Sequence, residues 1–152
     1  CLGDDFDEAL LKAMTATGFV LPCRGVLLSL GPVGDKYRFS DEAATLVKMG
    51  LPLFATQGTA EILRREGIDC QMVDKMSGAI EKMRNGQIDL VINVPREYDA
   101  QGRPDGFHIR RAAIDFEIPL ITDLWVARKM VRAMSRYTID ELKIKPLHAY
   151  VG

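Results

Sequence analysis

Apolar positions along the chain follow two alternating patterns. Short apolar runs are separated by longer segments in which apolar residues recur every three or four positions. The runs have the length of buried strands, and the segments between them have the period of helices. This alternation predicts repeated strand–helix–strand units. The predicted strands are residues 25–30, 51–56, 69–73, 89–94 and 119–122.

Residues that start and stop helices fall between the predicted strands. A hydroxyl residue precedes each of three helical segments and a glycine follows it. These pairs are Ser40 and Gly50, Thr59 and Gly67, and Ser77 and Gly86. Residues 123–136 carry the apolar stripe of a helix packed on a sheet, formed by Leu124, Ala127, Met130, Val131 and Met134. Five strands joined by helices predict a three-layer α/β/α fold around a five-stranded parallel sheet.

Composition and charge narrow the class of protein. The 152 residues are enough for one compact domain. The 20 Lys and Arg residues balance 21 Asp and Glu residues, so the net charge near −1 predicts no nucleic-acid partner and no membrane partner. No apolar run approaches the roughly 20 residues that cross a bilayer. Cys1, Cys23 and Cys70 are too widely spaced for a disulfide framework or a metal-binding pair, which favours a reducing compartment, and we expect the cytoplasm.

Candidate binding residues lie at the ends of the predicted strands. In a parallel sheet of this kind, ligands bind outside the carboxyl ends of the strands. The first strand is followed by GPVGDK, a loop that can bend around a ligand and present Lys36. The second leads into FATQGTAEIL, in which Gly58 lets the backbone approach a ligand and Thr56 and Thr59 offer hydroxyl groups. A helix that begins near Thr59 also directs unpaired N–H groups and the positive end of its dipole to this place.

Two more polar residues lie at the remaining strand ends. Lys75 follows the third strand in VDKMSG. Asn93 lies inside the apolar fourth strand, where an amide without a partner would cost about 1–3 kcal/mol. Each candidate also has a structural explanation: a lysine in solvent, a helix cap, or an amide paired with backbone. Because all of these strand ends share one rim, together they favour a binding site for a phosphate or a carboxylate.

Five segments together resemble the C-terminal regulatory domain of the large subunit of carbamoyl phosphate synthetase, a methylglyoxal-synthase-like domain. The segments are FDEALLKAMTATGFVLP ahead of GVLLSL, FATQGTAEIL, MVDKMSG, IDLVINVPRE and IRRAAIDFEIPLITD. The resemblance runs from Asp5 to Tyr150 and implies a flavodoxin-like fold. It also implies that residues 1–24 are a lead-in helix and connector from a preceding domain, and that residues 25–152 are the regulatory domain.

The resemblance implies an allosteric function. Bacterial relatives bind UMP, which inhibits, and IMP, which activates, whereas relatives in the urea cycle bind N-acetylglutamate. Where bacterial relatives can place a hydroxyl residue, this chain has Pro95, so the match indicates the place of the site more firmly than the effector. A nucleotide such as UMP or IMP is the first choice and N-acetylglutamate the second. The implied effector-binding residues are Lys36, Thr56, Gly58, Thr59, Lys75, Asn93 and Pro95.

The parent enzyme implied by the resemblance is a glutamine-hydrolysing carbamoyl-phosphate synthase, an ATP-dependent ligase of pyrimidine and arginine biosynthesis. Its ATP and magnesium sites lie in other domains. We therefore expect this chain to be regulatory, with no catalytic residue, metal or cofactor of its own. The expected partners are the remaining domains of the large subunit and the glutaminase small subunit.

Two alternatives remain open. Methylglyoxal synthase, a lyase that eliminates phosphate from dihydroxyacetone phosphate, needs acid and base groups beside the phosphate. Its family places a histidine-rich run before the lysine that follows the first strand, where this chain reads LGPVGDK. It also places a histidine and aspartates after the fourth strand, where this chain has Asp105 and, at the start of the next helix, His108. The other alternative is a docking module with a degenerate pocket.

Overall fold

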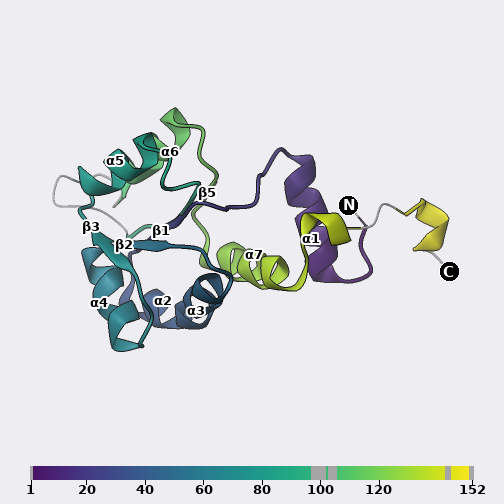
Figure 1. Cartoon of the computed structure of the whole chain (residues 1–152), viewed down its shortest axis with the longest axis horizontal. Helices are drawn as coiled ribbons and strands as arrows, with labels where there is room; N and C mark the ends of the chain where they lie inside the picture. Colours follow the sequence, from purple (N-terminus) through teal and green to yellow (C-terminus); the bar gives the residue numbers. More distant parts are fainter. Residues whose placement is uncertain (1, 97–101, 103–105, 143–144, 151–152) are drawn as a thin grey trace.

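The computed structural model describes residues 2–96, 102, 106–142 and 145–150 of the chain (Figure 1). Helices and strands alternate through most of this length. In chain order they are α1 (Phe6–Ala16), β1 (Val26–Leu30), α2 (Val33–Arg38), α3 (Ser40–Lys48), β2 (Leu53–Thr56), α4 (Gln57–Arg65), β3 (Gln71–Val73), α5 (Gly78–Arg84), β4 (Leu90–Val94), α6 (Phe107–Asp115), β5 (Leu120–Ile121) and α7 (Leu124–Arg136), followed by two short 3₁₀ helices, η1 (Ile139–Glu141) and η2 (Leu147–Ala149).

The five strands form one sheet in which every neighbouring pair is parallel, in the order β3-β2-β1-β4-β5. The chain therefore builds outward from β1 to β3 and then returns, so that the strand order reverses between β1 and β4. Helices α5 and α6 cover one face of the sheet, and α2, α3, α4 and α7 cover the other (Figure 1). The predicted five-stranded parallel sheet and the three-layer, flavodoxin-like α/β/α fold are confirmed.

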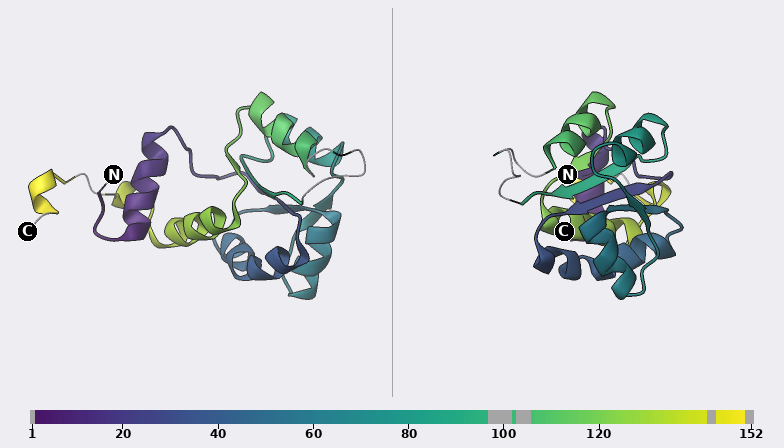
Figure 2. Two further views of the ribbon diagram at one scale, coloured as in Figure 1. Left: turned by 180° about the vertical axis from the view of Figure 1, so that it is seen from behind. Right: turned by 90° about the vertical axis from the view of Figure 1, so that its left-hand side faces the viewer.

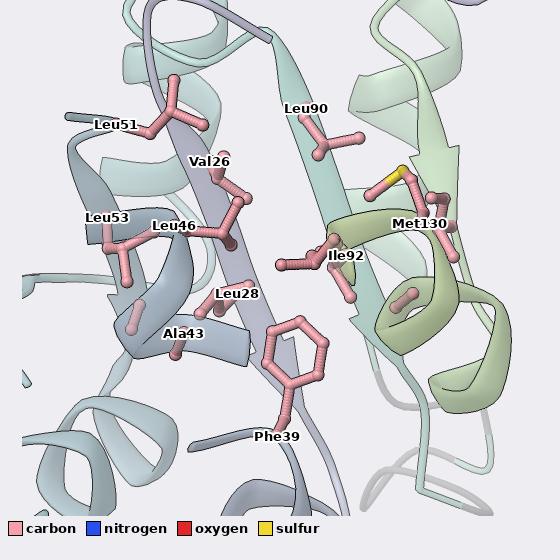
Figure 3. Close-up of a cluster of buried hydrophobic side chains, with 14 of the residues drawn as sticks. Val26, Leu28, Phe39, Ala43, Leu46, Leu51, Leu53, Leu90, Ile92 and Met130 are labelled. Carbon is pink, nitrogen blue, oxygen red and sulfur yellow. The ribbon is translucent and has the colours of Figure 1, made fainter. Parts of the chain in front are cut away.

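Successive residues of β1 belong to two hydrophobic cores, because neighbouring side chains of a strand point to opposite faces of the sheet. Val26 and Leu28 pack with α3, α4 and α7 (Figure 3). Leu27 packs with α5 and α6 on the other face. All five residues of β1 are buried. This two-sided burial explains why the strand is apolar at every position except Ser29, rather than alternating with polar residues.

Helix α7 confirms the predicted apolar stripe. The Asp123 side chain caps the helix by accepting a hydrogen bond from the Val126 backbone N–H at 2.9 Å. Of the five predicted stripe residues, Leu124 is partly buried and the other four are buried, namely Ala127, Met130, Val131 and Met134. No helix in the described part of the chain is long and apolar enough to cross a membrane.

Helix α1, the predicted lead-in helix, packs against α7 beyond the edge of the sheet (Figures 1 and 2). Its Leu11 is fully buried and belongs to the same core as β1 and α7. Asp7, only 4% exposed, forms ion pairs with Arg132 and Arg136 of α7. Tyr137 donates a hydrogen bond to Asp5 at 2.8 Å. The division into residues 1–24 and residues 25–152 stays a prediction.

The segment GPVGDK is largely helical, so the prediction of a loop after the first strand is wrong. Helix α2 begins at Val33 and includes Lys36. Pro32 precedes the helix with a φ of −65°, the value that its ring imposes and that suits a helix start. The fully buried Phe39 then joins α2 to α3. Six residues are too few to show a helical period, which explains the error.

The starts of two other helices also differ from the predicted caps. Helix α4 begins at Gln57 with Thr56 as its N-cap, so Thr59 lies within the first turn. Ser40 is the first residue of α3 rather than the residue before it. Ser77 is the N-cap of α5, as predicted. The shift at α4 matters because it brings three backbone N–H groups to the end of β2.

Candidate functional site

A cavity of about 670 Å³ opens at the carboxyl ends of the strands. Its walls come from four strand ends, those of β1, β2, β3 and β4. Five of the seven predicted site residues line it: Lys36, Thr56, Gly58, Thr59 and Lys75. The other lining residues are Ser29, Leu30, Gly31, Gln57, Met72, Val73, Asp74 and Arg96. The structure thus brings the candidates from the first three strand ends into one site.

The floor of the cavity is the start of α4. The backbone N–H groups of Gln57, Gly58 and Thr59 belong to the first turn of the helix, where no intrahelical acceptor exists. The N-cap residue Thr56 makes no side-chain capping bond, and its hydroxyl instead lies 3.4 Å from Oγ of Ser29. No acidic residue lies in this first turn. The helix therefore presents N–H donors and the positive end of its dipole to the cavity.

Lys36 lies directly against this helix start. Its side chain is 4% exposed, and its Nζ would be 3.0 Å from a Cβ atom built on Gly58. A glycine at position 58 therefore leaves room for the ammonium beside the first turn of α4. The two features, one from α2 and one from α4, place a positive charge and N–H donors within reach of the same anion.

The Thr59 hydroxyl makes its hydrogen bonds to the backbone of β1. Its side chain is fully buried. Its Oγ1 accepts a hydrogen bond from the Leu30 N–H at 3.0 Å and donates one to the Leu30 carbonyl oxygen at 3.3 Å. The hydroxyl thus ties α4 to the end of β1, and contact of Thr59 with an effector stays a prediction.

The turn that carries Lys75 is organised by Asp74, which the sequence analysis missed. The Asp74 carboxylate accepts hydrogen bonds from the backbone N–H of Ser77 at 2.7 Å, from the Ser77 hydroxyl at 2.9 Å and from the Met76 N–H at 3.0 Å. These hydrogen bonds, that from the Ser77 N–H foremost, hold the pKa of Asp74 below its usual value. The signal in the sequence was an Asp followed by a Ser three residues later, which is typical of such turns.

Asn93 does not line the cavity in the described structure, and neither does Pro95. The Asn93 amide is 1% exposed, donates to the Ser29 carbonyl oxygen at 3.0 Å and accepts from Nη1 of Arg110 at 2.6 Å. Gly106 allows this packing, since a Cβ there would lie 2.6 Å from the amide. The backbone partner that the sequence left open is therefore present. Contact of Asn93 or Pro95 with an effector stays a prediction.

Arg96 lines the cavity and was not among the predicted site residues. Its Nε donates a hydrogen bond to the Gly31 carbonyl oxygen at 2.9 Å. The Gly31 N–H in turn donates to the Val94 carbonyl oxygen at 2.7 Å. The signal in the sequence was a basic residue shortly after the fourth strand. The contact that this residue makes, however, depends on which strand lies beside β4.

The described residues offer no group of three or more His, Cys, Asp or Glu side chains suited to a metal ion. His108 lies on α6 and is not among the residues that line the cavity. Asp105 lies outside the described residues. In the part of the chain that the structure describes, the cavity is therefore lined by the start of α4 and by Lys36, and no histidine is among its lining residues.

Comparison with known proteins gives a consistent picture. Residues 39–122 match the family model described as MGS-like domain. The chain is 37% identical, over 94% of its length, to a protein of Methanopyrus kandleri named as the C-terminal section of carbamoyl phosphate synthase large chain. It is 36% identical, over 92% of its length, to the multifunctional protein pyr-3 of Neurospora crassa. The chain spans 27% of the first relative and 8% of the second.

Solved structures show the same fold at lower sequence identity. A crystal structure of methylglyoxal synthase from Elizabethkingia anophelis aligns with a TM-score of 0.57 and 17% identity, covering 84% of this chain and 90% of that one. A crystal structure of ForH aligns with a TM-score of 0.51 and 18% identity, covering 75% of this chain and 81% of that one. At these identities the likeness concerns the fold.

Proposed function

Because this chain belongs to the MGS-like domain family, we propose that it is the effector-binding domain at the C-terminal end of a carbamoyl phosphate synthase large chain. The chain makes up a small share of each relative's length, so ATP-dependent carbamoyl phosphate synthesis belongs to other parts of the parent. The proposed partners are those parts and a glutaminase small subunit, in the cytoplasm. The role of this chain is to bind a small molecule and adjust an activity that it does not itself perform.

The pairing of Lys36 with the start of α4 carries the proposal for the ligand. A buried ammonium, three N–H donors and Lys75 on the same cavity wall favour a phosphate, since a dianionic group can use both lysines at once. A single carboxylate has only two oxygens to share among these donors. The volume of about 670 Å³ is that of an ordinary small-molecule site. A nucleotide such as UMP or IMP is the first choice, and N-acetylglutamate is the second.

Regulation requires that the ligand prefer one of two conformations of the parent enzyme. A coupling of about 1–3 kcal/mol between two sites is typical of such systems. In this coupling the domain binds the ligand, and its contacts with the rest of the parent enzyme transmit the effect of binding.

Calorimetric titration of the chain with UMP, IMP and N-acetylglutamate tests the proposal. We expect saturable binding of UMP or IMP that is lost in Lys36→Met, which keeps the aliphatic stem and removes the charge. Thermal unfolding of the variant without ligand establishes that its fold is kept. Binding of N-acetylglutamate alone would overturn the choice of ligand. Binding of none of the three would leave the docking module as the better description.

A further inference from the structure

Two large aromatic side chains lie in solvent where α1 and α7 pack together. Phe6, the first residue of α1, is 62% exposed, and Trp125, in the first turn of α7, is 65% exposed. Val126, the neighbour of Trp125, is also exposed. Single exposed apolar residues are common on protein surfaces, whereas exposed apolar residues that adjoin one another mark interaction sites.

Lys129 connects the two rings. It lies four residues after Trp125 and three after Val126, so these three side chains share one face of α7. Its Nζ lies 5.8 Å from the centroid of the Phe6 ring on α1. Phe6, Trp125, Val126 and Lys129 therefore adjoin one another across two helices that lie side by side (Figures 1 and 2). We call these four residues the Trp125 surface.

Contacts beneath the Trp125 surface hold it in place. Cζ of Arg128 lies 5.3 Å from the centroid of the Trp125 ring. Nε of Arg128 in turn donates a hydrogen bond to Glu42 of α3 at 2.8 Å. The ion pairs of Asp7 with two arginines of α7 hold α1 against α7 and so fix the place of Phe6. A surface that is already ordered loses less conformational entropy when a partner binds.

The charges around the Trp125 surface indicate the chemistry of its partner. Among the described residues Lys129 makes no ion pair, whereas Arg128 and Arg132 each pair with a carboxylate. The nearby Asp123 accepts a hydrogen bond from the Val126 N–H as the cap of α7. An ammonium between exposed rings favours a partner that supplies a carboxylate and an apolar side chain. A second copy of the chain, paired through the same surface, would place two Lys129 ammonium groups in one interface, which disfavours it.

The parent is the natural source of such a partner. The chain makes up 27% and 8% of the two relatives compared above, so most of each relative lies outside it. On the proposed function, the preceding domain joins this chain just before α1, next to Phe6. Tryptophan and arginine, which meet here as Trp125 and Arg128, are the residue types that contribute most at the centres of interfaces.

We propose that the Trp125 surface binds a carboxylate-bearing segment of another part of the parent large chain. The inference rests on the proposed function, because it takes the parent as the source of the partner. An Asp or Glu of that segment pairs with Lys129, and an apolar side chain beside it covers the ring of Trp125. Arg128 positions this ring from below.

Chemical labelling of the full-length parent tests the contact. Acetylation of Lys129, followed by mass spectrometry, should be at least about fivefold slower in the parent than in the isolated chain, since a covered and ion-paired ammonium reacts poorly. A zero-length carbodiimide reagent should join Lys129 to an Asp or Glu of another part of the large chain. Lys129→Arg keeps the charge but cannot form this cross-link, so the product should disappear. Lys48, at the exposed end of α3, is the control for labelling.

Two variants test what the contact does. In the parent, Trp125→Ala and Lys129→Glu should each reduce the effect of UMP or IMP on carbamoyl phosphate synthesis by at least about threefold, because a central contact of the interface is lost. The UMP affinity of the isolated chain should be unchanged, since neither residue lines the cavity. Lys48→Glu makes the same change of charge and should alter neither quantity. Thermal unfolding of the isolated variants establishes that the fold is kept.

The possible failures can be told apart. Equal acetylation of Lys129 in the parent and in the isolated chain, with no cross-link, would overturn the docking surface. A cross-link from Lys129 to an Asp or Glu of this same domain in another copy would overturn the choice of partner. If the isolated chain still bound UMP or IMP in either case, the proposed function would stand. Binding of neither nucleotide would remove the proposed ligand, and the labelling of Lys129 would then decide the docking surface alone.

Discussion

The ammonium of Lys36 lies against Gly58, the only residue of α4 without a side chain, and a Cβ at position 58 would be 3.0 Å from its Nζ. The glycine is therefore explained by the lysine and not by backbone strain, since its φ is not among the positive values in the chain. This relationship allows a specific test of the site, because a single added methyl group at position 58 would displace only the Lys36 ammonium.

Gly58→Ala should weaken UMP binding while keeping the fold. The new methyl group displaces the end of a flexible side chain by a few tenths of an ångström and not the backbone. Alanine is favoured over glycine in helices by about 0.5–1 kcal/mol, so thermal stability should hold or rise. Calorimetry should show a UMP affinity that is lower by about threefold to tenfold. This loss corresponds to roughly half to all of the net free energy that one weak hydrogen bond contributes.

Gly34→Ala in α2 is the control for that experiment. A Cβ at position 34 would meet only Arg38, at 3.9 Å, and Gly34 does not line the cavity. Its UMP affinity should match that of wild type. Equal affinities of Gly58→Ala and Gly34→Ala would show that the position of Lys36 does not matter for binding.

Lys75→Ala should weaken UMP or IMP binding by about 1.5–3 kcal/mol, the range for a lost hydrogen bond to a charged group. The fold should be unaffected, because a lysine in a turn after a short edge strand supports little packing. Lys48→Ala, at the exposed end of α3, is the control for the change in net charge. The same affinity in both variants would remove Lys75 from the site.

Asn93→Ala should destabilise the protein even without a ligand. It leaves the buried Ser29 carbonyl oxygen without its side-chain donor and Arg110 without the amide acceptor. The expected loss in the free energy of unfolding is about 1–3 kcal/mol, measured with urea. Asn85→Ala, at the exposed end of α5, should cost much less. Unchanged stability combined with lost nucleotide binding would instead make Asn93 a ligand-binding residue.

The Asp74 turn should weaken in acid. Because the pKa of Asp74 is lowered in the folded state, its contribution to stability is present above the unfolded value near 3.8 and is lost as the pH falls through the lower folded value. Asp74→Asn lacks this contribution at every pH. The difference in melting temperature between wild type and variant should therefore be largest near neutral pH and shrink below pH 3.8. A difference that is constant with pH would contradict this.

The chain should form no methylglyoxal from dihydroxyacetone phosphate above the uncatalysed background. No histidine is among the described residues that line the cavity, although the lyase needs an acid and a base beside the phosphate. A colorimetric assay for methylglyoxal measures the outcome. Turnover that disappears in Asp105→Asn would show that the chain is a lyase after all.

The strands could be predicted from the sequence because a strand that is buried on both faces is almost entirely apolar. Strands β1 and β4 have one polar residue each, Ser29 and Asn93. The stripe of α7 was equally readable, since one face of a long helix packs on the sheet. Helix α2 was missed because its six residues are shorter than two helical turns. Local pattern therefore succeeds where an element is long enough to repeat it.

The site was predicted in part for a related reason. Gly58 and Lys75 lie within two residues of a strand end, and Lys36 lies on the helix that follows β1, so their place at the rim follows from the topology. Asn93 on β4 pairs with Arg110 on α6, 17 residues away, and with the Ser29 carbonyl oxygen on β1, and no local pattern indicates either partner. Arg96 was missed because its contact with Gly31 depends on β4 lying beside β1, which the order along the chain does not reveal.

The packing of α1 on α7 makes the domain depend on the first residues of the chain for the burial of one side of α7. Shortening the protein to residues 25–152 would expose the apolar side of α7 that Leu11 covers, and would leave Arg132 and Arg136 without Asp7. Any force that pulls α1 away from the domain would therefore act first on α7, which begins directly after β5. A movement of α1 relative to the domain would in this way reach the edge of the sheet through α7.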